Sequence, residues 1–173
     1  MKRIEYKFAE KKDWPRGEWD QEPDKVQWTD EATGLPCLAV RSNPEMMGNW
    51  CGYVGVSEGH PFFAKDFEQI DAGLAVHGGL TFSNFCAPED KEHGICHVPG
   101  PGEPDRIWWL GFDCGHAFDY QPAMAARFEM LGGVPSKYWH LPEAKYRNLA
   151  YVQAECVSLA EQLAAVEKGI IGE

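Results

Sequence analysis

Residues 108–116 have the sequence WWLGFDCGH, and this stretch decides the fold that we expect. Its first five residues are large and hydrophobic or glycine, which is typical of a strand buried on both faces. Alternation along such a strand places Trp108, Leu110 and Phe112 on one face and the residues between them on the other. We therefore predict that residues 107–113 form the central strand of a sheet.

A second stretch of the same character lies earlier in the chain, where residues 77–82 have the sequence HGGLTF. Together with residues 74–76 it predicts a strand that neighbours the central one. The Gly78-Gly79 pair interrupts this strand, since two glycines bend the backbone or let a ligand approach it closely.

Further strands are expected at residues 3–9, 35–41 and 50–56, where hydrophobic, aromatic and β-branched residues alternate or cluster. A short helix is expected at residues 123–131, because a proline precedes it and a Gly-Gly pair follows it.

The last predicted element is a helix over residues 142–168, closed by Gly169. Its hydrophobic residues are spaced three and four apart and so form one stripe. They are Leu149, Val152, Cys156, Leu159, Leu163 and Val166. The stripe is expected to pack on the sheet, and a homodimer through this C-terminal helix is the alternative. The order of elements predicts an α+β fold, a mainly antiparallel twisted sheet packed by a long C-terminal helix.

The chain has 173 residues, of which 44% are hydrophobic and 13% aromatic, and it is expected to form a single domain over residues 1–173. Residues 1–33 form a polar N-terminal segment that is rich in Trp. Its three Trp side chains predict that this segment folds back onto the body of the protein.

The formal net charge of −11 argues against binding of duplex nucleic acid, which needs a basic patch. The first residues lack the apolar core of a signal peptide, and no apolar run is long enough to span a membrane. We therefore expect a cytoplasmic protein whose six cysteines are reduced.

Polar side chains at the strand ends predict a catalytic pocket formed by His60, His77, Asp113 and His116. Such a set binds a divalent metal ion, or lets a histidine act as a base that a carboxylate orients. The structural alternatives are that Asp113 caps the following turn and that His77 is a buried histidine bonded to a backbone carbonyl.

The same pocket is expected to bind its ligand through five further residues. The hydroxyl group of Thr81 and the open backbone of Gly78 and Gly79 are suited to an anion or a carbonyl oxygen. The aromatic rings of Tyr53 and Trp109 are expected to form its walls.

A long loop, residues 86–106, contains Cys86, His93, Cys96 and His97. These are the residue types that zinc prefers, and they predict a structural zinc site. Their spacing does not match a zinc finger or ribbon, and adjacent Cys96 and His97 cannot easily contact one ion. A reactive cysteine nucleophile is the alternative, although no thiol is marked as activated.

Several of these stretches resemble a widespread set of uncharacterised phage and prophage proteins. The resemblance covers about residues 50–165 and is carried by CGYVGV at 51–56, GHP at 59–61, HGGLTF at 77–82, CHVP at 96–99, PGEPD at 101–105, WWLGFDCGH at 108–116 and YVQAEC at 151–156. The family tends to have Ala where this chain has Gly115. The resemblance implies a phage protein in the cytoplasm of a bacterial host cell.

Three functions follow from these patterns. The first is a small metal-assisted or His-assisted hydrolase, or a binder of a small nucleotide-like ligand, with a divalent metal such as Zn as cofactor. The second is a non-enzymatic acidic accessory protein that inhibits or sequesters a host protein. The third is a structural role in which the histidines belong to the core. Motifs of phosphate-binding loops, serine esterases and zinc proteases are absent from the sequence.

Overall fold

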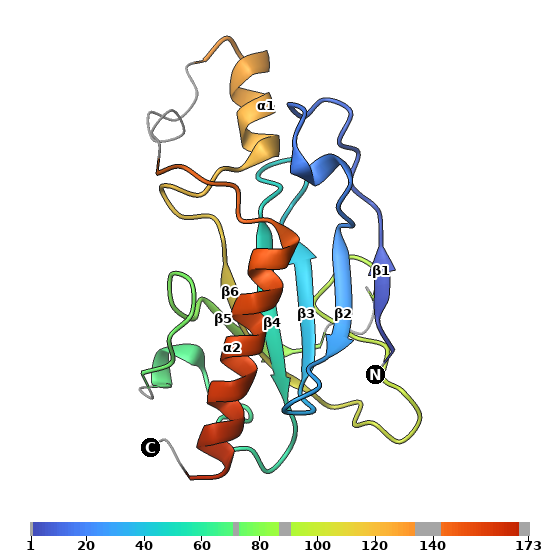
Figure 1. The fold of residues 1–173 in the computed structure, drawn as a ribbon, viewed down its shortest axis with the longest axis vertical. Coiled ribbons are helices and arrows are strands. Elements are labelled where there is room, and N and C mark those ends of the chain that lie inside the picture. Colours follow the sequence, from blue (N-terminus) through green and yellow to red (C-terminus); the bar gives the residue numbers. More distant parts are fainter. Residues whose placement is uncertain (1, 71–72, 87–90, 134–142, 170–173) are drawn as a thin grey trace.

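A six-stranded antiparallel sheet is the centre of the computed structural model, which describes residues 2–70, 73–86, 91–133 and 143–169 (Figure 1). The strand order is β1-β2-β3-β4-β6-β5. The strands are β1 (Ile4–Tyr6), β2 (Lys25–Thr29), β3 (Pro36–Arg41), β4 (Trp50–Val56), β5 (Phe82–Phe85) and β6 (Trp108–Asp113). The helices are α1 (Pro122–Met130) and α2 (Leu149–Glu167), with short 3-10 helices η1 (Glu18–Asp20) and η2 (Phe67–Gln69). The α+β class and the antiparallel sheet are therefore confirmed.

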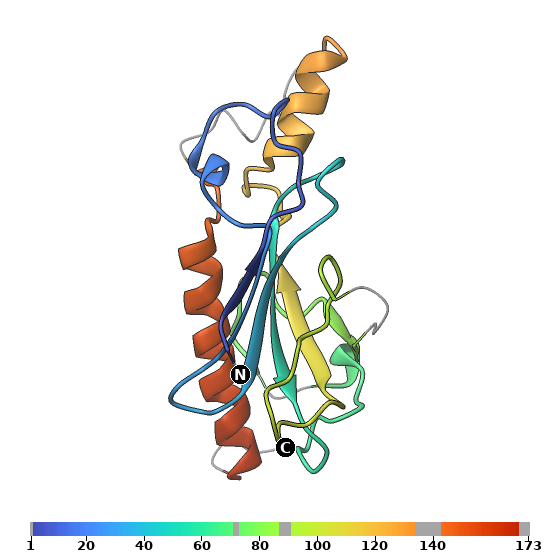
Figure 2. The ribbon, with the colours of Figure 1, turned by 90° about the vertical axis from the view of Figure 1, so that its right-hand side faces the viewer.

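The two faces of β6 are buried against different parts of the chain, as alternation along the strand predicts. Trp108, Leu110 and Phe112 belong to the core between the sheet and α2. Trp109 belongs to a second core on the other face, together with Tyr53 of β4. Seen nearly edge-on, the sheet has α2 on one side only (Figure 2).

The face opposite α2 is covered by residues 91–106 (Figure 2). Lys25 of β2 is fully buried there, and its ammonium group donates to the carbonyls of Lys91 and Gly94 at 2.6 and 2.7 Å. The side-chain amide of Gln27 bonds both backbone groups of Val98, at 2.9 and 3.0 Å. The expected loop is therefore fastened to the sheet through buried polar side chains, which satisfy its backbone.

Helix α2 packs its hydrophobic stripe on β3 and β4. Asn148 caps its first turn by accepting a hydrogen bond from the Tyr151 amide at 3.0 Å. Close approach is possible because Gly52 of β4 has no side chain, and a Cβ there would overlap Phe112 and Cys156. The stripe is thus buried against the sheet, so a homodimer through this helix would have to form through the exposed face of α2.

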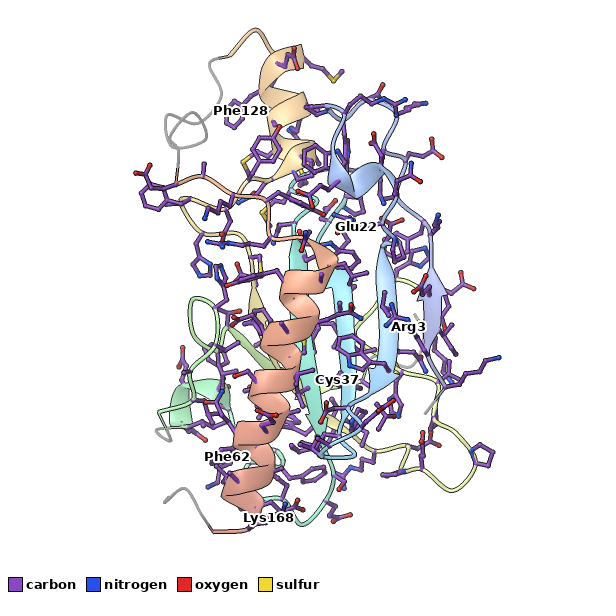
Figure 3. All side chains as sticks on the ribbon, viewed as in Figure 1. Arg3, Glu22, Cys37, Phe62, Phe128 and Lys168 are labelled. Atoms are coloured by element: carbon purple, nitrogen blue, oxygen red, sulfur yellow. A yellow bond between two sulfur atoms is a disulfide. The ribbon has the colours of Figure 1, made fainter. Side chains whose placement is uncertain are left out.

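The N-terminal segment is held to the body by buried charges, which we call the buried ion network and define as Glu22, Asp24 and Arg41. The Arg41 guanidinium donates to Asp24 and to Glu22, each at 3.0 Å. The Glu22 carboxylate also accepts the backbone amide of Leu149 at 2.7 Å, at the start of α2. Figure 3 labels Glu22 close to that end of the helix. The segment therefore folds back as expected, and it positions α2.

The structure corrects the predicted start of the C-terminal helix, which begins at Leu149 and not near residue 142. Residues 134–142 lie outside the described residues, and residues 143–148 do not form a helix. Lys145 in this stretch pairs with the backbone of Asp119. Tertiary partners on either side of the stretch keep it from forming a helix, although its composition permits one.

The structure also corrects the sheet near the Gly-Gly pair. Residues 73–81 are not a strand, because Gly78 and Gly79 form a turn with positive φ angles of 68° and 86°. Pairing with β6 starts only at Phe82 in β5. Strand β2 was not predicted, although its polar and apolar residues alternate, because it lies in the polar N-terminal segment.

None of the helices in the described part of the chain has the length and apolar content that a membrane crossing needs.

Candidate functional site

Three side chains from two loops meet beside α2, and we call them the His–Asp cluster: His77, His116 and Asp119. One ligand atom from each side chain lies within 4.8 Å of the others, so the group could hold a metal ion. His77 comes from the turn before β5, whereas His116 and Asp119 follow β6. The sequence analysis predicted both histidines of this cluster.

Asp119 is the centre of the cluster. Its Oδ2 atom lies 2.7 Å from Nε2 of His77 and 3.3 Å from Nδ1 of His116. The Asp119 side chain is only 2% exposed, whereas the His77 and His116 side chains are 13% and 40% exposed. The carboxylate is thus enclosed by protein, and solvent reaches the cluster from the His116 side.

Outer partners hold two of the three side chains. Nδ1 of His77 lies 3.0 Å from the Tyr151 hydroxyl group of α2. Oδ1 of Asp119 accepts a hydrogen bond from Nε of Arg147 at 2.9 Å. Burial and the nearby Glu155 carboxylate raise the pKa of Tyr151, so its phenol remains protonated at neutral pH. With these partners in place, Nε2 of His77 and Oδ2 of Asp119 point toward each other inside the cluster.

The backbone of the His77 loop is fastened to α2. The amide of His77 donates to Glu155 at 2.8 Å. Two residues earlier, the side-chain amide of Gln162 bonds both backbone groups of Ala75, at 2.7 and 2.8 Å. Glu155 and Gln162 lie seven residues apart, which is two helical turns, so one face of α2 holds the loop.

The His116 ring lies directly against the turn that contains His77. A Cβ on Gly78 would overlap the His116 ring, whereas a Cβ on Gly79 would meet no atom within 4 Å. The two histidine rings are 5.2 Å apart at their centroids and lie edge to face. Gly78 therefore gives His116 the space that it occupies in the cluster.

The charge state of Asp119 follows from opposing effects. Burial alone would raise its pKa, but hydrogen bonds from Arg147 and His77 more than compensate. Its pKa therefore lies below the ordinary value, and the group is a carboxylate at neutral pH. A carboxylate between two imidazoles can bind a divalent cation, or it can orient His77 as a general base.

Asp113, the predicted carboxylate of the pocket, caps a turn. Its Oδ1 atom accepts the Gly115 amide at 2.9 Å, as the structural alternative predicted. The cluster uses Asp119 in its place. The pattern His116-x-x-Asp119 was the available signal for this residue, since two positions three apart in a turn bring their side chains together.

The structure does not bring His60 to the cluster. Its Nε2 atom lies 3.0 Å from the Leu163 carbonyl, and its Nδ1 accepts the Phe62 amide at 3.0 Å. Leu163 lies 12 residues after Tyr151, or about 18 Å along α2. His60 is 5% exposed and joins the loop after β4 to the far end of the helix.

The predicted ligand-binding residues are divided between two places. Gly78 and Gly79 form the turn beside His116. Thr81 is exposed, and its backbone amide donates a hydrogen bond to the carbonyl of Gly111 in β6 at 2.8 Å. Tyr53 and Trp109 face the opposite side of the sheet from α2, so they do not form walls around the cluster.

The predicted Cys2His2 zinc site is contradicted, because Cys86 and Cys96 form a disulfide. Bonded sulfurs carry no thiolate charge for a metal ion. His93 packs on the Phe8 ring, and His97 packs on Trp109 with its Nδ1 atom unpaired. The disulfide also corrects the expectation that all six cysteines are reduced.

The other four cysteines are free and buried, and they are Cys37, Cys51, Cys114 and Cys156. Burial raises the pKa of Cys37 and of Cys51 to about 12, so both remain thiols at neutral pH. A protonated, enclosed thiol is a poor nucleophile. These four residues therefore act as small core side chains, and no nucleophile is found among them.

No family model matches the chain, and neither the curated proteins nor the solved structures contain a match. The resemblance to phage proteins stays a prediction, and the chemistry of the His–Asp cluster rests on its own geometry.

Proposed function

We propose that the protein binds a divalent transition-metal ion, zinc in the first place, through the His–Asp cluster and uses it to hydrolyse a small substrate. Two imidazoles and one carboxylate are a ligand set found in catalytic zinc sites. The chain would supply three ligands, which leaves a coordination position for water or substrate. The exposed side of His116 is where that position would open.

One observation carries the proposal. His77 and Asp119 each have a hydrogen-bond partner on the atom turned away from the other ligands, namely Tyr151 and Arg147. Metal-binding histidines almost always bond a partner through the second ring nitrogen, and ligating carboxylates are likewise hydrogen-bonded. Such partners fix the orientation of both side chains.

One separation between ligand atoms also suits zinc. Bonds of about 2.0–2.1 Å in a tetrahedral site place neighbouring ligand atoms about 3.3 Å apart. His116 and Asp119 have this separation, at 3.3 Å. His77 and Asp119, at 2.7 Å, would have to separate by about half an ångström to admit the ion.

The reaction would use a water molecule on the ion. A zinc ion held there would supply the nucleophile, since zinc lowers the pKa of a bound water molecule to about 7. His77, His116 and Asp119 would hold the ion that supplies this nucleophile, and the exposed side of His116 would admit the substrate.

Zinc titration of chelator-treated protein, followed by calorimetry, tests the metal site. We expect one zinc ion per chain in the wild type. His77→Gln, His116→Gln and Asp119→Asn should each weaken binding more than about a hundredfold, since even outer partners contribute about 10–100-fold. His93→Gln is the control, because His93 is exposed and belongs to another part of the surface.

Unchanged zinc affinity in all three ligand variants would contradict the metal site. The hydrolase is tested separately, by release of nitrophenol from nitrophenyl phosphate and nitrophenyl acetate with zinc-loaded protein. Zinc binding without turnover of either ester would contradict the hydrolase and leave a binding role.

A further inference from the structure

Arg147 is the cation nearest the inner carboxylate of the cluster, and most of its bonding capacity is unused. A guanidinium carries five N–H donors in a rigid planar fork. Only the Nε donor is bound, to Asp119 at 2.9 Å. Within the ranges that the structure describes, no acceptor is bonded to either terminal nitrogen of Arg147. The side chain is 25% exposed, so solvent reaches part of it.

Two contacts fix the orientation of the fork. Besides the bond to Asp119, the guanidinium carbon lies 4.9 Å from the centroid of the Tyr151 ring, over its face. The hydrogen bond to Asp119 holds the positive charge and raises the pKa of Arg147. The guanidinium is thus held by Asp119 at its Nε edge and by Tyr151 on one face. Because the side chain is already ordered, a ligand that binds its terminal nitrogens has less conformational entropy to offset.

Arg41 in the buried ion network shows what a structural arginine looks like in this protein. Its guanidinium bonds Asp24, Glu22, the Gly48 carbonyl and the Tyr146 hydroxyl group, and its side chain is fully buried. Arg147 makes one such bond. An arginine placed only to neutralise Asp119 would not need a side chain that solvent partly reaches.

With a divalent ion bound, the local charge would favour an anion, although the whole chain carries a net charge of −11. A divalent ion and Arg147 would bring three positive charges, against one negative charge each from Asp119 and Glu155. The balance is one positive charge. An anionic group that bridges the ion and Arg147 would neutralise it.

We infer that the substrate of this site carries a phosphoryl group, which Arg147 binds through its terminal nitrogens while another phosphoryl oxygen contacts the metal ion. The inference rests on the metal site proposed above. A phosphoryl group suits both partners, because it offers several oxygens around one centre and matches the guanidinium fork in two-point contacts. A carboxylate has only two oxygens and cannot give two to Arg147 and a third to the ion.

Anion binding to the Co²⁺-loaded protein tests this inference. The first step is a Co²⁺ titration of the wild type and the variants, followed in the visible spectrum. Inorganic phosphate is then added at saturating Co²⁺, and acetate is added in a parallel series. We expect phosphate to change the Co²⁺ spectrum of the wild type and to bind at least about tenfold more tightly than acetate.

Arg147→Gln should weaken phosphate binding at least about tenfold at saturating Co²⁺, because the charge and the fork are both lost. Arg147→Lys keeps the charge and should recover only part of that loss. Lys145→Gln is the matched control, since Lys145 is an exposed cation two residues away, and it should leave phosphate binding unchanged.

The outcomes separate the two proposals. Absence of Co²⁺ binding in the wild type would overturn both. Normal Co²⁺ binding with equal phosphate affinity in the wild type and Arg147→Gln would overturn only the role of Arg147. Acetate that binds as tightly as phosphate would overturn the phosphoryl specificity.

Discussion

The buried ion network and the His–Asp cluster are both built around acidic side chains. They differ in how many of their hydrogen-bonding groups already have a protein partner. Asp24 and Arg41 of the network have side chains that are 1% and 0% exposed. Arg41 is also enclosed by rings, with its guanidinium carbon 4.4 Å from the Trp50 ring centroid. In the cluster, by contrast, the His116 side chain is 40% exposed. Arg147, beside the cluster, makes one hydrogen bond to it, through Nε.

The difference shows which charged groups in this protein stabilise the fold and which are available to a ligand. A fully bonded, buried group gains nothing from a further partner, so the network can only hold the N-terminal segment and α2 together. A cluster that solvent reaches and that retains open donors can take up an ion or an anion. Burial and unused bonding capacity, more than the types of residues, distinguish the two regions.

The largest effect is expected from breaking the network. Arg41→Met should lower the free energy of unfolding by about 3–5 kcal/mol, because it removes a cation from the buried Asp24 carboxylate and from the partly buried Glu22 carboxylate. Arg147→Met is the corresponding change in the cluster and should cost about 1 kcal/mol in the metal-free protein, since Asp119 keeps its bond to His77. Urea denaturation measures both losses, and equal losses would contradict the distinction between the two regions.

A change at Gly78 should affect the cluster and leave the network intact. Gly78→Ala should weaken zinc binding about 10–100-fold, as loss of ligand support does elsewhere, because the new methyl group displaces the His116 ring. Gly79→Ala is the control, since it also has a positive φ angle but an open surrounding.

Both glycine variants should lose about 1 kcal/mol of stability from backbone strain, measured by thermal unfolding. Zinc titration then isolates the effect of the ring. Equal zinc affinity in the two variants would show that the position of His116 does not matter for metal binding.

The smallest expected effect is the dependence of stability on pH. Burial alone would raise the pKa of Asp24 and of Glu22, but hydrogen bonds from Lys11 to Asp24 and from the Leu149 amide to Glu22 contribute to a net lowering. The stabilisation is complete above the ordinary values of 3.8 and 4.5 and is lost as the pH falls through the lower folded-state values.

Each unit by which a pKa is lowered corresponds to about 1.4 kcal/mol. Urea denaturation of the wild type and Glu22→Gln at pH 7, 5, 4 and 3 measures this contribution. We expect the variant to be less stable at pH 7 and to lose less stability on acidification. Parallel curves for the two proteins would indicate that Glu22 does not contribute to the acid sensitivity.

Several elements were predictable because local residue patterns determine them. The alternation in residues 108–112 predicted the two faces of β6, and the spacing of apolar residues predicted the stripe of α2. Pro122 and the Gly-Gly pair after α1 marked a helix whose bounds agree within one residue. Each of these signals depends on neighbours within one or two turns.

The parts that were mispredicted depend on partners far away in the sequence. Lys25 and Gln27 are polar residues in a buried strand, and they are buried because residues 91–98 supply their hydrogen bonds. The disulfide between Cys86 and Cys96 is an exception, since it joins residues only ten positions apart, and their spacing does not distinguish a disulfide from two metal ligands.

The sequence by itself determined the class of the fold, the faces of its central strand, and the two histidines at the ends of hydrophobic stretches. Only the tertiary structure selected Asp119 over Asp113 and assigned His60 to the far end of α2. The physical reason is that a site requires ligand atoms within a few ångströms of each other. That distance is set by how loops from different strands fold against one helix, and local residue patterns alone do not determine it.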